Sequence, residues 1–124
     1  MTSLCRLFFS AVLAFAVVGC GAQYDPAANL TPDEAEGLRV VEAKGCQSCH
    51  GDQGRGGAGP AWTGLAGSEV ELADGSVVVA DEAYLLRSIL DPSADLVAGY
   101  NLRMPPNDLT QDEAEAVVAY IGGR

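Results

Sequence analysis

Positive charge is scarce in this sequence. Its 124 residues include 7 Lys and Arg against 17 Asp and Glu, which gives a formal net charge of −10 at pH 7. A surface this acidic argues against binding to nucleic acid and against attraction to anionic lipid by charge. It suits a soluble domain that docks on a basic patch of a partner.

The chain is also short of material for a hydrophobic core. At 124 residues it is long enough for one small domain, and such a domain buries little apolar surface with which to offset the entropy of the chain. No internal repeat is present that could extend the core. We therefore expect something besides side-chain burial to stabilise the domain.

Long apolar runs are confined to the N-terminus. Arg6 precedes an almost purely apolar stretch at residues 7–18, which is shorter than the roughly 20 residues of a membrane-spanning helix and is typical of an export signal. Gly19 followed by Cys20 resembles the lipobox of bacterial lipoproteins. We expect residues 1–19 to be a lipoprotein signal peptide, Cys20 to be lipidated and residues 20–30 to be a lipid-anchored linker; an ordinary cleaved signal or an uncleaved anchor is the alternative.

Removal of this signal leaves few residues for chemistry. Arg6 is the only charged residue in it, so the processed chain is one unit more negative, and Cys5 is lost with it. With Cys20 acylated, Cys46 and Cys49 are the remaining thiols, so no disulfide framework is expected in spite of export.

These two thiols lie beside the only histidine, in "GCQSCHG" at residues 45–51, before the glycine-rich stretch "DQGRGGAGPAW". A thioredoxin-like site would place the pair after a strand at the start of a helix, and no such strand precedes Cys46. A structural zinc site needs four ligands, and the processed chain offers too few Cys and His.

Covalent attachment of haem needs only the motif C-x-x-C-H on the face of the haem where the histidine binds the iron. On a helical turn the thiols of Cys46 and Cys49 share a face and can reach both vinyl groups of one porphyrin, while His50 meets the iron. We expect one covalently attached haem c, whose apolar surface would also supply the missing core. The alternatives for Cys46 and Cys49 are a zinc site, a thiol–disulfide exchange site and a buried pair of free thiols.

The other face of such an iron needs a ligand or stays open. Met104, in "NLRMPPND", is the only methionine left after removal of the signal. The two prolines after it restrict the loop backbone, so a thioether can be held in one place. Met104 is the candidate for the second axial ligand, and a methionine that fills a gap in the core is the alternative.

"GCQSCH", "GPAWTGLAG" and "MPP" before a final amphipathic helix resemble a class I cytochrome c from about residue 30 to the end. Residues 67–100 are most similar to the cytochrome c domain at the C-terminus of subunit II of caa3-type cytochrome oxidases, here as a stand-alone lipoprotein without the cupredoxin domain and its dinuclear copper ligands. The resemblance implies that the carbonyl of Pro60 accepts a hydrogen bond from the proximal imidazole. Trp62 stands where the family often has leucine.

The expected fold is all-α: a class I cytochrome c fold around one haem at residues 31–124, with a short β-hairpin insertion. A capping box and Pro32 predict a first helix over residues 32–44. The resemblance implies that Gly37 in this helix meets Tyr120 of the last helix.

Strands are expected at residues 70–72 and 77–79, around an Asp-Gly turn. A helix from residue 81 stops at Asp91-Pro92, and a second capping box, Thr110 to Glu113, opens a helix that ends at Gly122-Gly123.

With His50 and Met104 both bound, no position on the iron is open to substrate, which favours outer-sphere electron transfer over catalysis. We expect an electron carrier rather than an enzyme, with respiratory redox proteins (a donor and a terminal oxidase) as partners. No small-molecule substrate is expected. We expect the protein to be exported to the periplasmic or outer cell-surface side and to be tethered to a membrane by lipidated Cys20. A gas sensor or peroxidase-like protein with a labile Met104 is the alternative function, and a lipoprotein without haem is another.

Four side chains are candidates for contact with the haem propionates: Arg55, Arg87, Arg103 and Tyr84.

Overall fold

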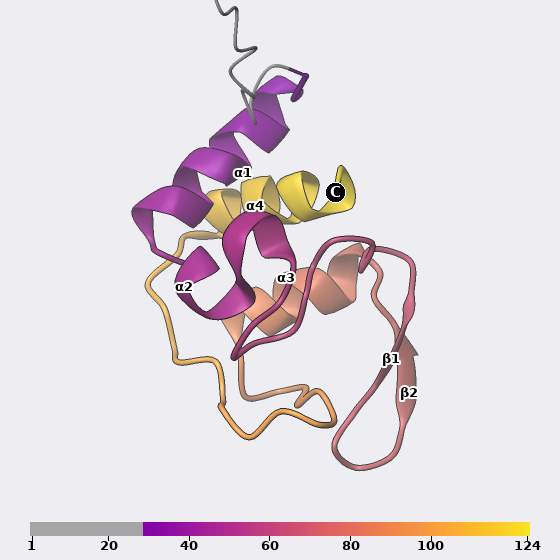
Figure 1. Cartoon of the computed structure of the whole chain (residues 1–124). Helices are drawn as coiled ribbons and strands as arrows, with labels where there is room; N and C mark the ends of the chain where they lie inside the picture. The colour runs from indigo at the N-terminus through magenta and orange to yellow at the C-terminus, as the bar shows by residue number, and fades with distance from the viewer. Residues whose placement is uncertain (1–28) are drawn as a thin grey trace, which may run out of the picture.

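The computed structural model describes residues 29–124, so the predicted signal peptide, Cys20 and most of the linker lie outside the described residues. The chain folds into helices with one small antiparallel sheet (Figure 1), which confirms the predicted fold class. None of the described helices is long and apolar enough to cross a membrane. The elements are, in order, α1 Pro32–Ala43, α2 Gln47–His50, the 3-10 turn η1 Asp52–Gly54, β1 Glu69–Glu71, β2 Val77–Val79, α3 Glu82–Leu90 and α4 Gln111–Gly122.

The core is built on the crossing of α1 and α4, the most extensive contact between two elements (Figure 1). Gly37 lies at this crossing: a Cβ added to it would collide with the backbone carbonyl of Ala116 and lie 2.7 Å from the Cβ of Tyr120. Glycine therefore lets the two backbones approach closely, which confirms the contact predicted between Gly37 and Tyr120.

Both helices begin at the predicted capping boxes. Thr31 accepts a hydrogen bond from the backbone N–H of Glu34, whose carboxylate accepts one from the N–H of Thr31 at 2.6 Å. Thr110 and Glu113 repeat this exchange at α4. α1 ends at Ala43, one residue earlier than predicted, because Lys44 forms its C-cap.

The predicted β-hairpin is present, with its first strand one residue earlier than expected. Val70 pairs with Val78 in the centre of the ladder, and Gly75 takes a positive φ of 84° in the turn. Leu72, expected in the strand, instead forms an isolated bridge with Val97. This bridge joins the hairpin to the long loop that follows α3.

α3 begins after Asp81, whose carboxylate accepts a hydrogen bond from the N–H of Tyr84 at 2.8 Å. Its apolar face packs against α4. Residues 91–110 then form no helix or strand, and the side-chain amide of Asn107 donates to the carbonyl of Ile89 at 2.7 Å. This loop, which carries Met104, is therefore attached to the end of α3.

Candidate functional site

One helical turn carries both thiols and the imidazole. Cys46 is the N-cap of α2, and its carbonyl accepts hydrogen bonds from the N–H groups of Cys49, at 3.3 Å, and His50, at 3.1 Å. The N–H of Cys46 in turn donates to the carbonyl of Val41 at the end of α1. The core crossing of α1 and α4 thus fixes where the turn begins.

Both cysteines are free thiols of intermediate exposure. Cys46 packs against the hydrophobic core, and burial raises the pKa of its thiol above the ordinary value. The second thiol, on Cys49, lies three residues further along the same turn, so the pair can meet a group that has two attachment positions.

Within the described residues, the imidazole ring of His50 makes one hydrogen bond. Its Nδ1 lies 2.7 Å from the carbonyl oxygen of Pro60. A carbonyl oxygen can only accept, so Nδ1 carries the proton and Nε2 keeps its lone pair for a metal ion. The contact implied by the sequence resemblance is therefore present, and it sets the tautomer that an iron ligand needs.

The glycine-rich loop after α2 folds back on that turn and delivers Pro60. The N–H of Gly56 donates to the carbonyl of His50 at 2.7 Å, and the N–H of Gly59 donates to the carbonyl of Cys49 at 2.9 Å. At Gly51, φ is +77° and a Cβ would collide with the carbonyl of Gly56; a Cβ at Gly57 would lie 2.9 Å from the carbonyl oxygen of Cys49. The glycines allow the loop to lie directly on the backbone of α2.

Trp62 completes the surroundings of the imidazole. Its ring stacks on that of His50, with a centroid separation of 5.0 Å and an angle of 30° between the planes. The sequence marked Trp62 as a departure from the family but gave no indication of this contact.

Met104 lies in the loop before α4 and is 37% exposed. It lines a hollow of about 350 Å³ together with the end of α3 and its own loop, formed by Leu90, Asp91, Pro92, Ser93, Arg103, Pro105 and Pro106. Leu90, Tyr100 and Leu102 are also large exposed hydrophobic residues of α3 or this loop. Binding of the Met104 thioether to iron stays a prediction.

The donor set fits a c-type haem. Two thiols one turn apart match the two points at which such a haem is attached, and an imidazole with a free Nε2 and a thioether are ligands that its iron takes. Within residues 29–124, no three His, Cys, Asp or Glu side chains come together as they would around another metal ion.

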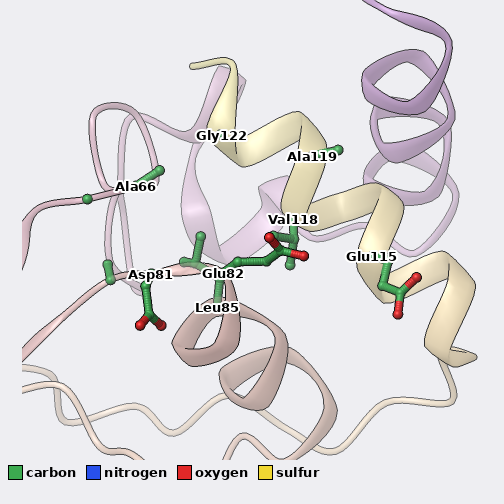
Figure 2. A pocket seen from close by; sticks show the side chains of 10 residues that line it. Ala66, Asp81, Glu82, Leu85, Glu115, Val118, Ala119 and Gly122 are labelled. Atoms are coloured by element: carbon green, nitrogen blue, oxygen red, sulfur yellow. The ribbon is translucent and has the colours of Figure 1, made fainter.

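A second hollow, of about 340 Å³, lies between α3 and α4 (Figure 2). Asp81, Glu82 and Glu115 line it together with small apolar residues. None of Cys46, Cys49, His50, Pro60 and Met104 contributes to it. It is therefore separate from the candidate haem site.

Two of the three arginines expected near the haem propionates are already paired. Arg55 forms an ion pair with Asp52 at 2.9 Å, and Arg87 forms one with Asp95 at 2.6 Å. Arg103 has no ion pair within the described residues and lines the hollow beside Met104. Tyr84 is 5% exposed, and burial raises the pKa of its phenol.

Comparison with known proteins agrees with this chemistry. No curated protein matches the sequence. The model of the family "Cytochrome c" matches residues 34–123, which is most of the chain. The protein therefore belongs to the cytochrome c family, binds one covalently attached haem c and carries electrons through it.

Proposed function

We propose that this cytochrome is a membrane-tethered, monohaem electron carrier that works in a respiratory chain and donates electrons to a terminal oxidase. The observation that carries the haem-based electron-carrier part of the proposal is the hydrogen bond from Nδ1 of His50 to the carbonyl of Pro60, at 2.7 Å. His50 lies on the same turn as the two free thiols. The hydrogen bond leaves Nε2 as the free ring nitrogen for the iron.

Each residue has one role in this proposal. Cys46 and Cys49 would attach the haem through thioether bonds, His50 and Met104 would bind its iron, and Pro60 would hold the imidazole. The haem iron would supply reversible one-electron exchange between its ferric and ferrous states. With both residues bound, His50 and Met104 would exclude substrate from the metal. A thioether ligand raises the reduction potential relative to a second imidazole, which suits donation to an oxidase.

The test of the site is the optical spectrum of the ferric protein. Ligation by a methionine sulfur gives ferric haem a weak long-wavelength band, which should be present in the native protein and absent in Met104→Ala. Leu102→Ala, an exposed residue of the same loop, should keep the band. If the native protein has bound haem c but lacks the band, the assignment of Met104 is overturned.

A second candidate function is that of a gas sensor or a peroxidase-like protein with a labile Met104. Met104 lies in a loop without helix or strand, residues 91–110, so displacement of its thioether would not require a helix or strand to unfold. Rapid binding of carbon monoxide by the native ferrous protein would favour this function. Binding that appears only in Met104→Ala would favour electron transfer.

The membrane tether is supported by the apolar run at residues 7–18 and by the lipobox-like Gly19-Cys20. We expect Cys20→Ala to move the haem protein from the membrane fraction to the soluble exported fraction, while Cys5→Ala, inside the predicted signal, leaves it on the membrane. Equal fractionation of both variants with the native protein would refute the lipid anchor at Cys20.

The oxidase is supported by the similarity of residues 67–100 to the cytochrome c domain of caa3-type subunit II. Purified ferrous protein should be oxidised by membranes of its own source, and cyanide, an oxidase inhibitor, should block this. Failure to react with any terminal oxidase there would overturn the partner and leave the electron carrier standing.

A further inference from the structure

We propose that Trp62 is a positioning residue that fixes the plane of the His50 imidazole, and through it the electronic state of the iron. This inference rests on the proposed function, because it takes His50 as an iron ligand. It adds Trp62 to the proposed site as a residue that contacts the imidazole of His50 and not the iron.

The hydrogen bond to Pro60 cannot fix the imidazole alone. It holds Nδ1 in one direction, at 2.7 Å from the carbonyl oxygen, but it leaves the ring free to rock about the line that joins the two atoms. A flat surface against the ring face removes this freedom. Trp62 supplies that surface, with centroids 5.0 Å apart and planes 30° from parallel.

The indole itself is held firmly. Trp62 is 4% exposed, and its backbone N–H donates to the carbonyl of Gly54 at 2.9 Å. The rings of Trp62 and Tyr120 form a T-shaped pair with centroids 6.5 Å apart. Gly54, at φ +72°, has no side chain where the indole lies, since a Cβ there would collide with Nε1. Trp62 is thus anchored between η1 and α4.

The contact with His50 is made by the ring of Trp62 and not by its polar atom. Nε1 is buried and has no hydrogen-bond partner among the described residues, so no hydrogen bond of the indole N–H to the protein helps to hold the ring. A phenyl ring at this position should replace the indole in contact with His50, whereas a branched aliphatic side chain should not.

The plane of an axial imidazole decides which iron d orbitals its π electrons overlap, so a change of plane alters the g values of ferric low-spin haem as well as the reduction potential. Electron paramagnetic resonance of the full-length haem-loaded protein measures this directly. We expect Trp62→Phe to keep the native g values and Trp62→Leu to shift and broaden them, with a shifted midpoint potential.

Leu85→Ala is the matched control, because Leu85 is buried in the same core on α3 and its loss should lower stability without a change in the g values. If Trp62→Leu fails to accumulate with haem, Gly54→Ala gives a second route, since its Cβ displaces the indole while Trp62 stays in the chain. The proposal would be overturned if Trp62→Leu, or Gly54→Ala in its place, kept the native g values. It would also be overturned if Leu85→Ala shifted the g values by the same amount. Absence of a low-spin signal from the native protein would instead refute the axial pair His50 and Met104.

Discussion

Gly37 of α1 lies against Tyr120 of α4 so closely that a Cβ on the glycine would be 2.7 Å from the Cβ of the tyrosine. This contact sets the distance between the two helices that form the core. The same contact bears on the haem site in two ways. The N–H of Cys46 donates to the carbonyl of Val41, which ties the start of α2 to α1. The ring of Tyr120 packs against Trp62.

We expect Gly37→Ala to lower the free energy of unfolding by about 1–3 kcal/mol, because the added methyl group overpacks the crossing. The gain in helix propensity from Gly to Ala, about 1 kcal/mol, acts in the opposite direction. Urea denaturation of the haem-loaded protein measures the difference. Gly122→Ala is the control, since a Cβ there meets nothing within 4 Å; equal stability of the two variants would show that the crossing tolerates a side chain.

The capping box of α1 predicts a pH dependence. Hydrogen bonds from Thr31 hold the pKa of the Glu34 carboxyl below its usual value of 4.5, and the charge of Arg124 acts in the same direction. A lowered folded-state pKa means that the contribution of Glu34 is present above pH 4.5 and is lost as the pH falls through the folded-state value. Glu34→Gln should therefore lower stability at pH 7, and the difference from the native protein should shrink as the pH falls below 4.5, as measured by thermal unfolding at about pH 7 and about pH 3.

Glu42→Gln, an exposed residue at the far end of α1, is the matched control for this experiment. A stability difference between Glu34→Gln and the native protein that is the same at both pH values would refute the role of the ionised carboxylate.

Local signals in the sequence were sufficient to predict most of the frame. Capping boxes at Thr31 and Thr110 and the Asp-Gly turn at Gly75 act over a few residues, so their pattern is visible in the chain, and the helices and the hairpin begin within one residue of the expected positions. The close contact of Gly37 with Tyr120 was predictable only from the resemblance to class I cytochromes c.

The rest depends on how loops pack, which no short pattern encodes. The path of the glycine-rich loop brings Trp62 onto His50, and the ion pair of Arg87 depends on the position that Asp95 takes in the loop after α3. Cys46, Cys49 and His50 lie on one turn as the motif predicts. Met104 is 54 residues away in sequence from His50, and its role still rests on the argument from ligand chemistry.

Arg103 provides the last prediction. It is the cation beside Met104 that forms no ion pair within the described residues, on a chain of net charge −10. An anionic redox reagent is repelled by the protein as a whole, so a single free guanidinium near the exposed site should decide where it approaches. We expect Arg103→Gln to slow oxidation of the ferrous protein by hexacyanoferrate(III) by about two- to fivefold at low salt, and the difference to shrink near 1 M salt, where the screening length is about 3 Å.

Arg55→Gln removes the same unit of charge, but from a residue already paired with Asp52. Net charge alone would make the two variants equally slow, whereas a local effect makes Arg103→Gln the slower one. Because both proteins then carry the same total charge, stopped-flow rates measured in parallel separate the two causes. Equal rates would mean that Arg103 has no special place at the surface where electrons leave, and that encounters with a partner depend on the tether rather than on charge.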